Sequence, residues 1–170
     1  NVAIGNSALG DTTTGYYNTA VGHLSLSLNT AGYDNVAIGR NAMGTSQGSY
    51  YSVGVGSYAL ANADSPASDN TAVGYYSASN ITTGRYNTAL GTYALSDTYI
   101  GSNNTALGYY AGGGDYQGEN SVYLGMNTAP NSWNETNQIA IGYGATGNGS
   151  NSVTLGNASI TKTVLRGKVG

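Results

Sequence analysis

The sequence has no cysteine and no phenylalanine, only two prolines, and few charged residues. Without cysteine the chain can form neither a disulfide nor a thiolate metal site. Five lysines and arginines stand against eight acidic residues, too little positive charge for a nucleic-acid-binding surface. The sequence contains no run of about 18 apolar residues, the length that a membrane-spanning helix needs. We therefore expect no nucleic-acid partner and no direct membrane insertion.

Large aliphatic side chains are also scarce, because Val, Ile and Leu make up only 28 of the 170 residues. That is too few for a compact globular core. The net charge of −3 is nevertheless too small for disorder driven by charge repulsion. A chain of this kind needs an architecture in which small apolar side chains are buried repeatedly, and stacked coils provide one.

A five-residue phrase recurs along the whole chain, in the form Asn-Thr-Ala-Leu-Gly at residues 104–108. Ten variants each end in glycine, and the step between glycines is 17 residues except for one step of 18 and a last step of 14. This period predicts a solenoid in which each unit is one coil. The closing glycines, which we expect to form the coils, are Gly5, Gly22, Gly39, Gly56, Gly74, Gly91, Gly108, Gly125, Gly142 and Gly156.

Within the phrase, apolar and small residues alternate as in a short β-strand: Val2 and Ile4 share one face, and Ala3 lies on the other. A looser second phrase, such as Ala8-Leu9, suggests a second strand in each coil. The sequence thus predicts an all-β fold, a parallel β-roll (β-solenoid) of about ten 17-residue coils. Residues 1–151 would form the β-roll repeats, and residues 152–170 the last repeat and a C-terminal transition segment.

The alternation also predicts which face is buried. We expect the Val/Thr and Ile/Leu positions to face the core and the alanines to form an open, narrow face. Packing of three such faces around an axis would remove the alanines from water, so the chain is expected to be a homotrimer. The asparagine that opens most units, such as Asn35, is expected to stack in a hydrogen-bonded ladder.

The phrases at residues 1–5, 35–39 and 138–142 resemble the head repeats of trimeric autotransporter adhesins. That resemblance implies a left-handed parallel β-roll assembled as a trimer. It departs from the family in length, because the familiar head repeat has about 14 residues and only the last step here matches it.

The variants with Tyr-Tyr at residues 70–76 and 104–110 are similar to repeats of phage tail fibres and of large surface proteins of environmental bacteria. The segment 152–160, continuing to 164–167, resembles the stretch before a tail-fibre chaperone domain. Both resemblances imply an extracellular fibre, on a bacterial cell surface or a virion tail.

Sixteen tyrosines and one tryptophan supply all the aromatic side chains. The repeat should display them in rows that either stack for stability, the favoured interpretation, or bind a cell-surface glycan or protein receptor. The irregular unit at residues 121–137 contains the tryptophan, as a contact point or as a plug over the end of the roll. The candidate binding residues are Tyr75, Tyr76, Tyr109, Tyr110, Tyr116, Trp133 and Tyr143.

The sequence offers no recognisable chemistry. His23 is the only histidine, and the acidic residues are scattered through the repeat. We expect no catalytic, cofactor-binding or metal-binding residues and no enzyme activity. The predicted function is that of a structural and adhesive segment of a trimeric extracellular fibre, binding receptors multivalently. The alternatives are a purely structural filament subunit or spacer and, less favoured, a carbohydrate-active or ice-binding solenoid.

Overall fold

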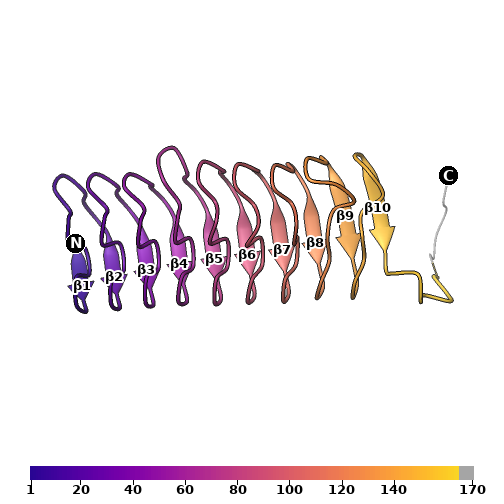
Figure 1. The fold of residues 1–170 in the computed structure, drawn as a ribbon, viewed down its shortest axis with the longest axis horizontal. Coiled ribbons are helices and arrows are strands. Elements are labelled where there is room, and N and C mark those ends of the chain that lie inside the picture. Colours follow the sequence, from indigo (N-terminus) through magenta and orange to yellow (C-terminus); the bar gives the residue numbers. More distant parts are fainter. Residues whose placement is uncertain (165–170) are drawn as a thin grey trace.

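A computed structural model of the chain describes residues 1–164 and shows a β-solenoid of about nine turns (Figure 1). Ten short parallel strands form one sheet in sequence order. The strands are β1 (Val2–Ile4), β2 (Thr19–Val21), β3 (Val36–Ile38), β4 (Val53–Val55), β5 (Thr71–Val73), β6 (Thr88–Leu90), β7 (Thr105–Leu107), β8 (Val122–Leu124), β9 (Gln138–Ile141) and β10 (Ser152–Leu155).

Equivalent positions of the repeat pair with one another in the sheet. Ala3 lies opposite Ala20, and Ala20 lies opposite Ala37. Each coil therefore advances the solenoid by one interstrand spacing, about 4.8 Å. The all-β class, the parallel stacking and the 17-residue coil are confirmed. Residues 1–164 contain no helix of the length and apolarity needed to cross a membrane.

The second strand predicted for each coil is wrong. The Ala-Leu phrase is a turn in which every other residue has a positive φ, as at Ser7 (54°) and Leu9 (53°). A strand requires continuous extended backbone, which this alternation does not provide. The turn is still bonded between coils, because the Leu9 N–H donates to the Ser25 carbonyl and the Leu26 N–H donates to the Ala42 carbonyl, both at 3.0 Å.

The predicted orientation of the strands is also wrong, because the alanines face the core. Ala20, Ala37 and Ala72 are fully buried at the centres of their strands, whereas Ile4 and Leu90 are 60% and 45% exposed. The interior is narrow because the turn returns along the opposite side of the coil. A Cβ added at Gly54, in an alanine position of β4, would lie 3.1 Å from the Ala59 carbonyl oxygen. Only a small strand residue fits opposite the turn.

A tyrosine in the alanine row shows how tightly the two sides match. Tyr123 replaces the alanine in β8 and is fully buried. Gly112 stands where the preceding coil has Leu95, and a Cβ at Gly112 would lie 2.9 Å from Cδ2 of Tyr123. The tyrosine ring thus occupies the volume that a turn leucine fills elsewhere, as close packing of a core demands.

The asparagine ladder is confirmed. Asn87 is buried, and its Nδ2 donates to Oδ1 of Asn70 at 3.1 Å and to the Gly101 carbonyl at 2.9 Å. Its own Oδ1 accepts the Asn104 N–H at 3.0 Å. One side chain therefore satisfies polar groups of three coils, as buried polar groups require. Gln138 takes the next asparagine position after Ser121, and within residues 1–164 neither amide atom of Gln138 has a hydrogen-bond partner.

The closing glycines are required by conformation and by space. Gly22 has φ of 138°, a region that other residues rarely adopt. A Cβ at Gly22 would lie 2.5 Å from the carbonyl oxygen of Gly39 in the next coil. A side chain at this position would therefore force neighbouring coils apart.

Deviations from the 17-residue repeat lie in the connections. The extra residue between β4 and β5 lengthens the loop that contains Pro66, which rises above its neighbours in Figure 1. The division of the chain at residue 151 stays a prediction. Of the transition segment, residues 165–170, including Arg166 and Lys168, lie outside the described residues.

Candidate functional site

The outward side of the sheet is a continuous apolar strip. Strand side chains that do not face the core form two straight rows, because equivalent residues pair in register. One row is Val2, Thr19, Val36, Val53, Thr71, Thr88, Thr105, Val122, Ile139 and Val153. The other is Ile4, Val21, Ile38, Val55, Val73, Leu90, Leu107, Leu124, Ile141 and Leu155. We call these 20 residues the sheet face.

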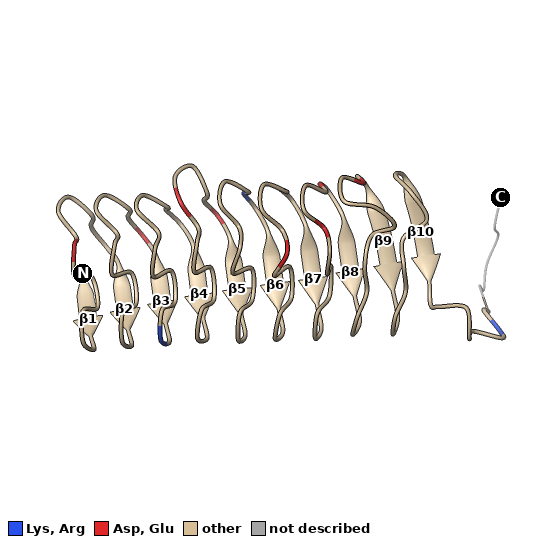
Figure 2. Ribbon diagram, in the orientation of Figure 1, with Lys and Arg blue, Asp and Glu red and all other residues tan. Residues whose placement is uncertain are grey.

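The sheet face carries no charge. None of the ten strands contains a lysine, arginine, aspartate or glutamate, and the coloured segments in Figure 2 lie in the turns and in the C-terminal segment. About half of each large aliphatic side chain at the two ends remains exposed, as with Val2 at 51% and Leu155 at 45%. An uncharged strip that runs the whole length of the sheet is a candidate interaction surface.

Threonines of the sheet face point outward. Thr71, Thr88 and Thr105 are exposed, so the expectation that this strand position faces the core is wrong. The threonine row is still interrupted by Val36, Val53 and other aliphatic residues.

Many tyrosines do stack between coils. Tyr16, Tyr33 and Tyr50 form a ladder with ring centroids 5.0 and 5.2 Å apart and nearly parallel planes. Tyr99 and Tyr116 repeat the arrangement at 5.3 Å. These rings pack on their own neighbours, which is the structural role that the repeat predicted.

The first candidate tyrosines form one cluster. Tyr75 lies edge-on to Tyr76 at 4.6 Å and to Tyr93 at 5.6 Å, and Tyr93 lies 6.2 Å from Tyr109. Tyr93 was not among the candidates, although its place two residues after Gly91 matches that of Tyr76 after Gly74. Tyr110 is engaged elsewhere, because its hydroxyl donates to Asp97 at 2.6 Å. That hydrogen bond, with partial burial, raises the pKa of Tyr110 to about 12.

Tyr116 and Trp133 lie together, with ring centroids 5.7 Å apart and planes tilted by 48°. With Gln117, Ser132 and Asn134 they line an open hollow of about 500 Å³. Trp133 is 71% exposed, and β9 and β10 continue the stack beyond it, so its unit is not a plug over the end. We call this the Trp133 hollow.

Tyr143 does not belong to either group. It follows Gly142, is exposed, and its carbonyl accepts a hydrogen bond from Asn157 Nδ2 at 2.7 Å. The seven candidate residues therefore form no single site. They divide into the Tyr75 cluster, the Asp97-bound Tyr110, the Trp133 hollow and Tyr143.

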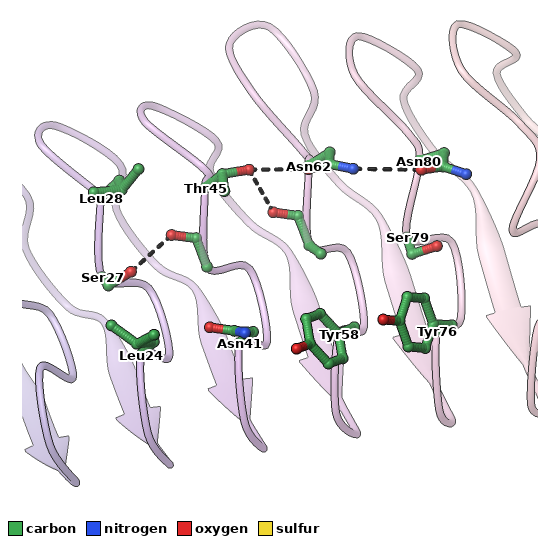
Figure 3. A pocket seen from close by; sticks show the side chains of 12 residues that line it. Leu24, Ser27, Leu28, Asn41, Thr45, Tyr58, Asn62, Tyr76, Ser79 and Asn80 are labelled. Atoms are coloured by element: carbon green, nitrogen blue, oxygen red, sulfur yellow. Dashed lines mark hydrogen bonds between the residues drawn. The ribbon is translucent and has the colours of Figure 1, made fainter.

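A second hollow of about 320 Å³, which the sequence did not reveal, runs along several coils on the turn side (Figure 3). Because the turn passes opposite the strand, this outer groove lies on the other side of the coil from the sheet face. Small residues form its floor, namely Ser27, Gly44, Ala61 and Ser79. Its walls are the row Leu24, Asn41, Tyr58 and Tyr76 and the row Leu28, Thr45, Asn62 and Asn80.

One acidic side chain is buried in the core. Asp115 accepts the Gly118 N–H at 2.7 Å and the Tyr123 hydroxyl at 2.9 Å. Burial raises the pKa of Asp115 to about 6, against the opposing effect of these two hydrogen bonds. Asn29, the equivalent residue of an earlier coil, accepts the Gly32 N–H in the same way at 3.0 Å. Asp115 thus forms the same turn contact that Asn29 forms in the earlier coil.

Several other carboxylates are held in local contacts. Asp97 bonds Tyr110, and Glu135 accepts the Ser150 hydroxyl at 2.6 Å. Within residues 1–164, no three histidine, cysteine, aspartate or glutamate side chains gather as metal ligands would.

Comparison of the chain with protein-family models, with curated proteins and with solved structures finds no match. The β-solenoid architecture therefore stands on the structure itself. The resemblance to adhesin heads and tail-fibre repeats stays a prediction.

Proposed function

We propose that this chain is a stiff segment of a homotrimeric extracellular fibre, in which three sheet faces pack together and the turn sides point outward. The observation that supports the proposal is the uncharged apolar sheet face. The sequence predicted a trimer from an exposed alanine face, but the exposed face is the sheet face on the other side of the strands. The expected assembly is the same, and the surface that forms it is different.

The size of the sheet face favours stable association. Its 20 side chains match the roughly 20–30 residues that each partner contributes to a standard interface.

The two rows of the sheet face suit a ring of three. In a threefold arrangement each chain has two neighbours, so the row of Val36 and Thr88 faces one of them and the row of Ile38 and Leu90 faces the other. Such head-to-tail contacts close on themselves without leaving an unpaired row. The outer surface would then carry three copies of the Trp133 hollow.

An adhesive role follows from that repetition. We assign receptor contact to the Trp133 hollow, where an exposed indole and a tilted tyrosine are surrounded by amide and hydroxyl side chains. Three weak contacts on one rigid fibre bind a surface more tightly than one. A location outside the cell, on a bacterial surface or a virion tail, belongs to the same proposal, which assigns the chain no catalytic role.

Sedimentation equilibrium of the wild type and two variants tests the assembly. Leu90→Lys places a charge on the sheet face, and Thr45→Lys places one on the opposite, exposed side. We expect a mass three times 17.2 kDa for the wild type and Thr45→Lys, and a shift toward 17.2 kDa for Leu90→Lys. A monomeric wild type, or a trimer unaffected by Leu90→Lys, would contradict the proposed interface.

Receptor contact is tested separately with the trimer on a glycan array and on immobilised host-cell surfaces. We expect Trp133→Ala to weaken retention on the host-cell surfaces while the mass stays trimeric. A trimer that binds no surface would favour the purely structural spacer.

Ice binding is the second candidate function, favoured only by the outward threonines on a flat, regular sheet. A trimer would bury that face, so we expect no thermal hysteresis from the wild type. Thermal hysteresis from a monomeric chain that Thr88→Lys abolishes would favour ice binding over the fibre.

A further inference from the structure

The outer groove is shaped by the repeat and has a definite end. Its floor position holds only small residues over four successive coils, from Ser27 to Ser79. At Gly113, two coils further along, the ring of Tyr110 lies over the floor, and its hydroxyl reaches Asp97 on the opposite wall. The Tyr110–Asp97 hydrogen bond thus closes the channel on the side toward β7.

The groove is lined entirely by uncharged side chains. One wall offers the amide of Asn41 and the rings of Tyr58 and Tyr76, which appear as open hexagons on the near side of the ribbon in Figure 3. Tyr58 is held in place by Tyr76, stacked at 4.6 Å, and by the Arg40 guanidinium, 4.8 Å from its ring centroid. Fixed aromatic rings beside amides suit a ligand with alternating apolar and hydroxyl surfaces.

The other wall is a line of side chains with spare hydrogen-bonding capacity. The Thr45 hydroxyl donates to the Ala61 carbonyl at 2.8 Å and lies 3.1 Å from Asn62 Oδ1. Asn62 Nδ2 approaches Asn80 Oδ1 at 3.4 Å, and Asn80 Nδ2 donates to the Ser96 carbonyl at 2.7 Å. An amide has two donor hydrogens and two acceptor lone pairs, so these contacts leave part of each group free. Hydroxyl groups both donate and accept, and therefore match such a wall.

The direction of the groove fixes the form of the ligand. Equivalent wall groups recur every coil, about 4.8 Å along the solenoid axis. That spacing is close to the length of one pyranose ring in an extended, β-linked chain, so successive sugars would lie beside successive coils. Two of these coils carry the same pair of wall residues, Tyr58 with Asn62 and Tyr76 with Asn80. A volume of about 320 Å³ accommodates a short stretch of such a chain.

We propose that the outer groove, from Leu24 to Asn80, binds a neutral, extended oligosaccharide that runs parallel to the solenoid axis. The absence of charge from its lining disfavours acidic glycans. An extended peptide would find side chains here and no free sheet edge with which to pair its backbone. The groove belongs to one chain and lies away from the sheet face, so this inference goes beyond the proposed trimer and does not depend on it.

Isothermal titration calorimetry of the 170-residue chain with cellohexaose, chitohexaose and mannohexaose tests the proposal, with a hexamer of galacturonate as the charged comparison. We expect saturable binding of at least one neutral hexasaccharide and at least tenfold weaker binding of the charged one. No binding of any neutral hexasaccharide at millimolar concentration would overturn the proposal.

Variants locate the binding. Ala61→Arg fills the floor of the groove and should weaken binding at least tenfold, whereas Ala31→Arg, the same change at an exposed alanine, should leave affinity unchanged. The double variant Asn62→Ala/Asn80→Ala removes the wall amides without adding bulk and should also weaken binding. Loss of binding in Trp133→Ala but not in Ala61→Arg would place the saccharide in the Trp133 hollow and overturn the assignment. The Leu90→Lys variant should bind as the wild type does, so failure of the trimer and failure of the groove give different results.

Discussion

Replacing Asp115 by asparagine should stabilise the protein at neutral pH and remove part of its pH dependence. Asp115 is fully buried, with a raised pKa of about 6 against an ordinary value of 3.8. Between these two pH values the folded state keeps a proton that the unfolded state has lost. The free energy of unfolding therefore falls as the pH rises through this window, and the stabilisation present below about pH 4 is gone above about pH 6.

The expected size follows from the pKa shift. A difference of about two pKa units corresponds to about 3 kcal/mol of unfolding free energy. The asparagine in the equivalent turn, Asn29, shows that an amide accepts the turn N–H of Gly32 in the same geometry. Asp115→Asn should thus keep the Gly118 hydrogen bond, offer its NH₂ to the Tyr123 oxygen, and lose only the buried charge. For a 170-residue chain that unfolds as one unit, about 3 kcal/mol raises Tm by about 8 °C.

Differential scanning calorimetry at pH 4 and pH 7.5, at equal protein concentration, measures the effect. We compare the wild type with Asp115→Asn and with Asp11→Asn, a control at an exposed position. The difference in Tm between wild type and Asp115→Asn should be large at pH 7.5 and nearly absent at pH 4. A variant that is less stable than the wild type at pH 7.5, or a difference independent of pH, would refute the reasoning.

Three further substitutions test the packing of the coils by chemical unfolding. Gly74→Ala should destabilise the protein by at least about 2 kcal/mol, because Gly74 has φ of 139° and an added Cβ would clash with the next coil. Gly10→Ala, whose Cβ would meet nothing closer than 3.4 Å, should change stability little, and equal effects of the two substitutions would contradict this account. Tyr123→Ala should lower the free energy of unfolding by about 3–5 kcal/mol. Adding Gly112→Leu should restore part of that loss, because the two substitutions together recreate the alanine–leucine pair of the other coils, and additive losses would refute this match. Asn87→Ala should cost about 3 kcal/mol or more by leaving buried groups in two neighbouring coils unpaired, and a loss below about 1 kcal/mol would show that the ladder is dispensable.

The fold class could be predicted because the regular 17-residue period of the sequence is typical of a solenoid. The coil length could be predicted from the spacing of the closing glycines, and the ladder from asparagines such as Asn35 and Asn87, since each depends only on equivalent residues lying one above another. The turn formed by Ala8 and Leu9 could not be recognised, because alternating positive φ values leave no mark in a pattern of ordinary residues. A leucine at such a position looks like part of a strand.

The prediction of which strand face is buried was wrong for a related reason. Large aliphatic residues normally mark the buried face, and here the buried face is held to alanine by the turn that lies opposite it, as Gly54 shows. Once the width of the coil is known, the outward valines and leucines become the main support for the proposed assembly. The outer groove was missed because its floor residues, such as Gly44 and Ala61, have no chemical signature in the sequence.

The central claim, that three sheet faces meet at the axis of a fibre, is tested most directly by distances between equivalent positions of neighbouring chains. The chain has no cysteine, so a single spin label can be placed through Thr88→Cys on the sheet face or Thr45→Cys on the opposite side. Double electron–electron resonance should give a short distance between labels at residue 88 and a clearly longer one between labels at residue 45. A shorter distance at residue 45, or no coupling at either position, would contradict the account.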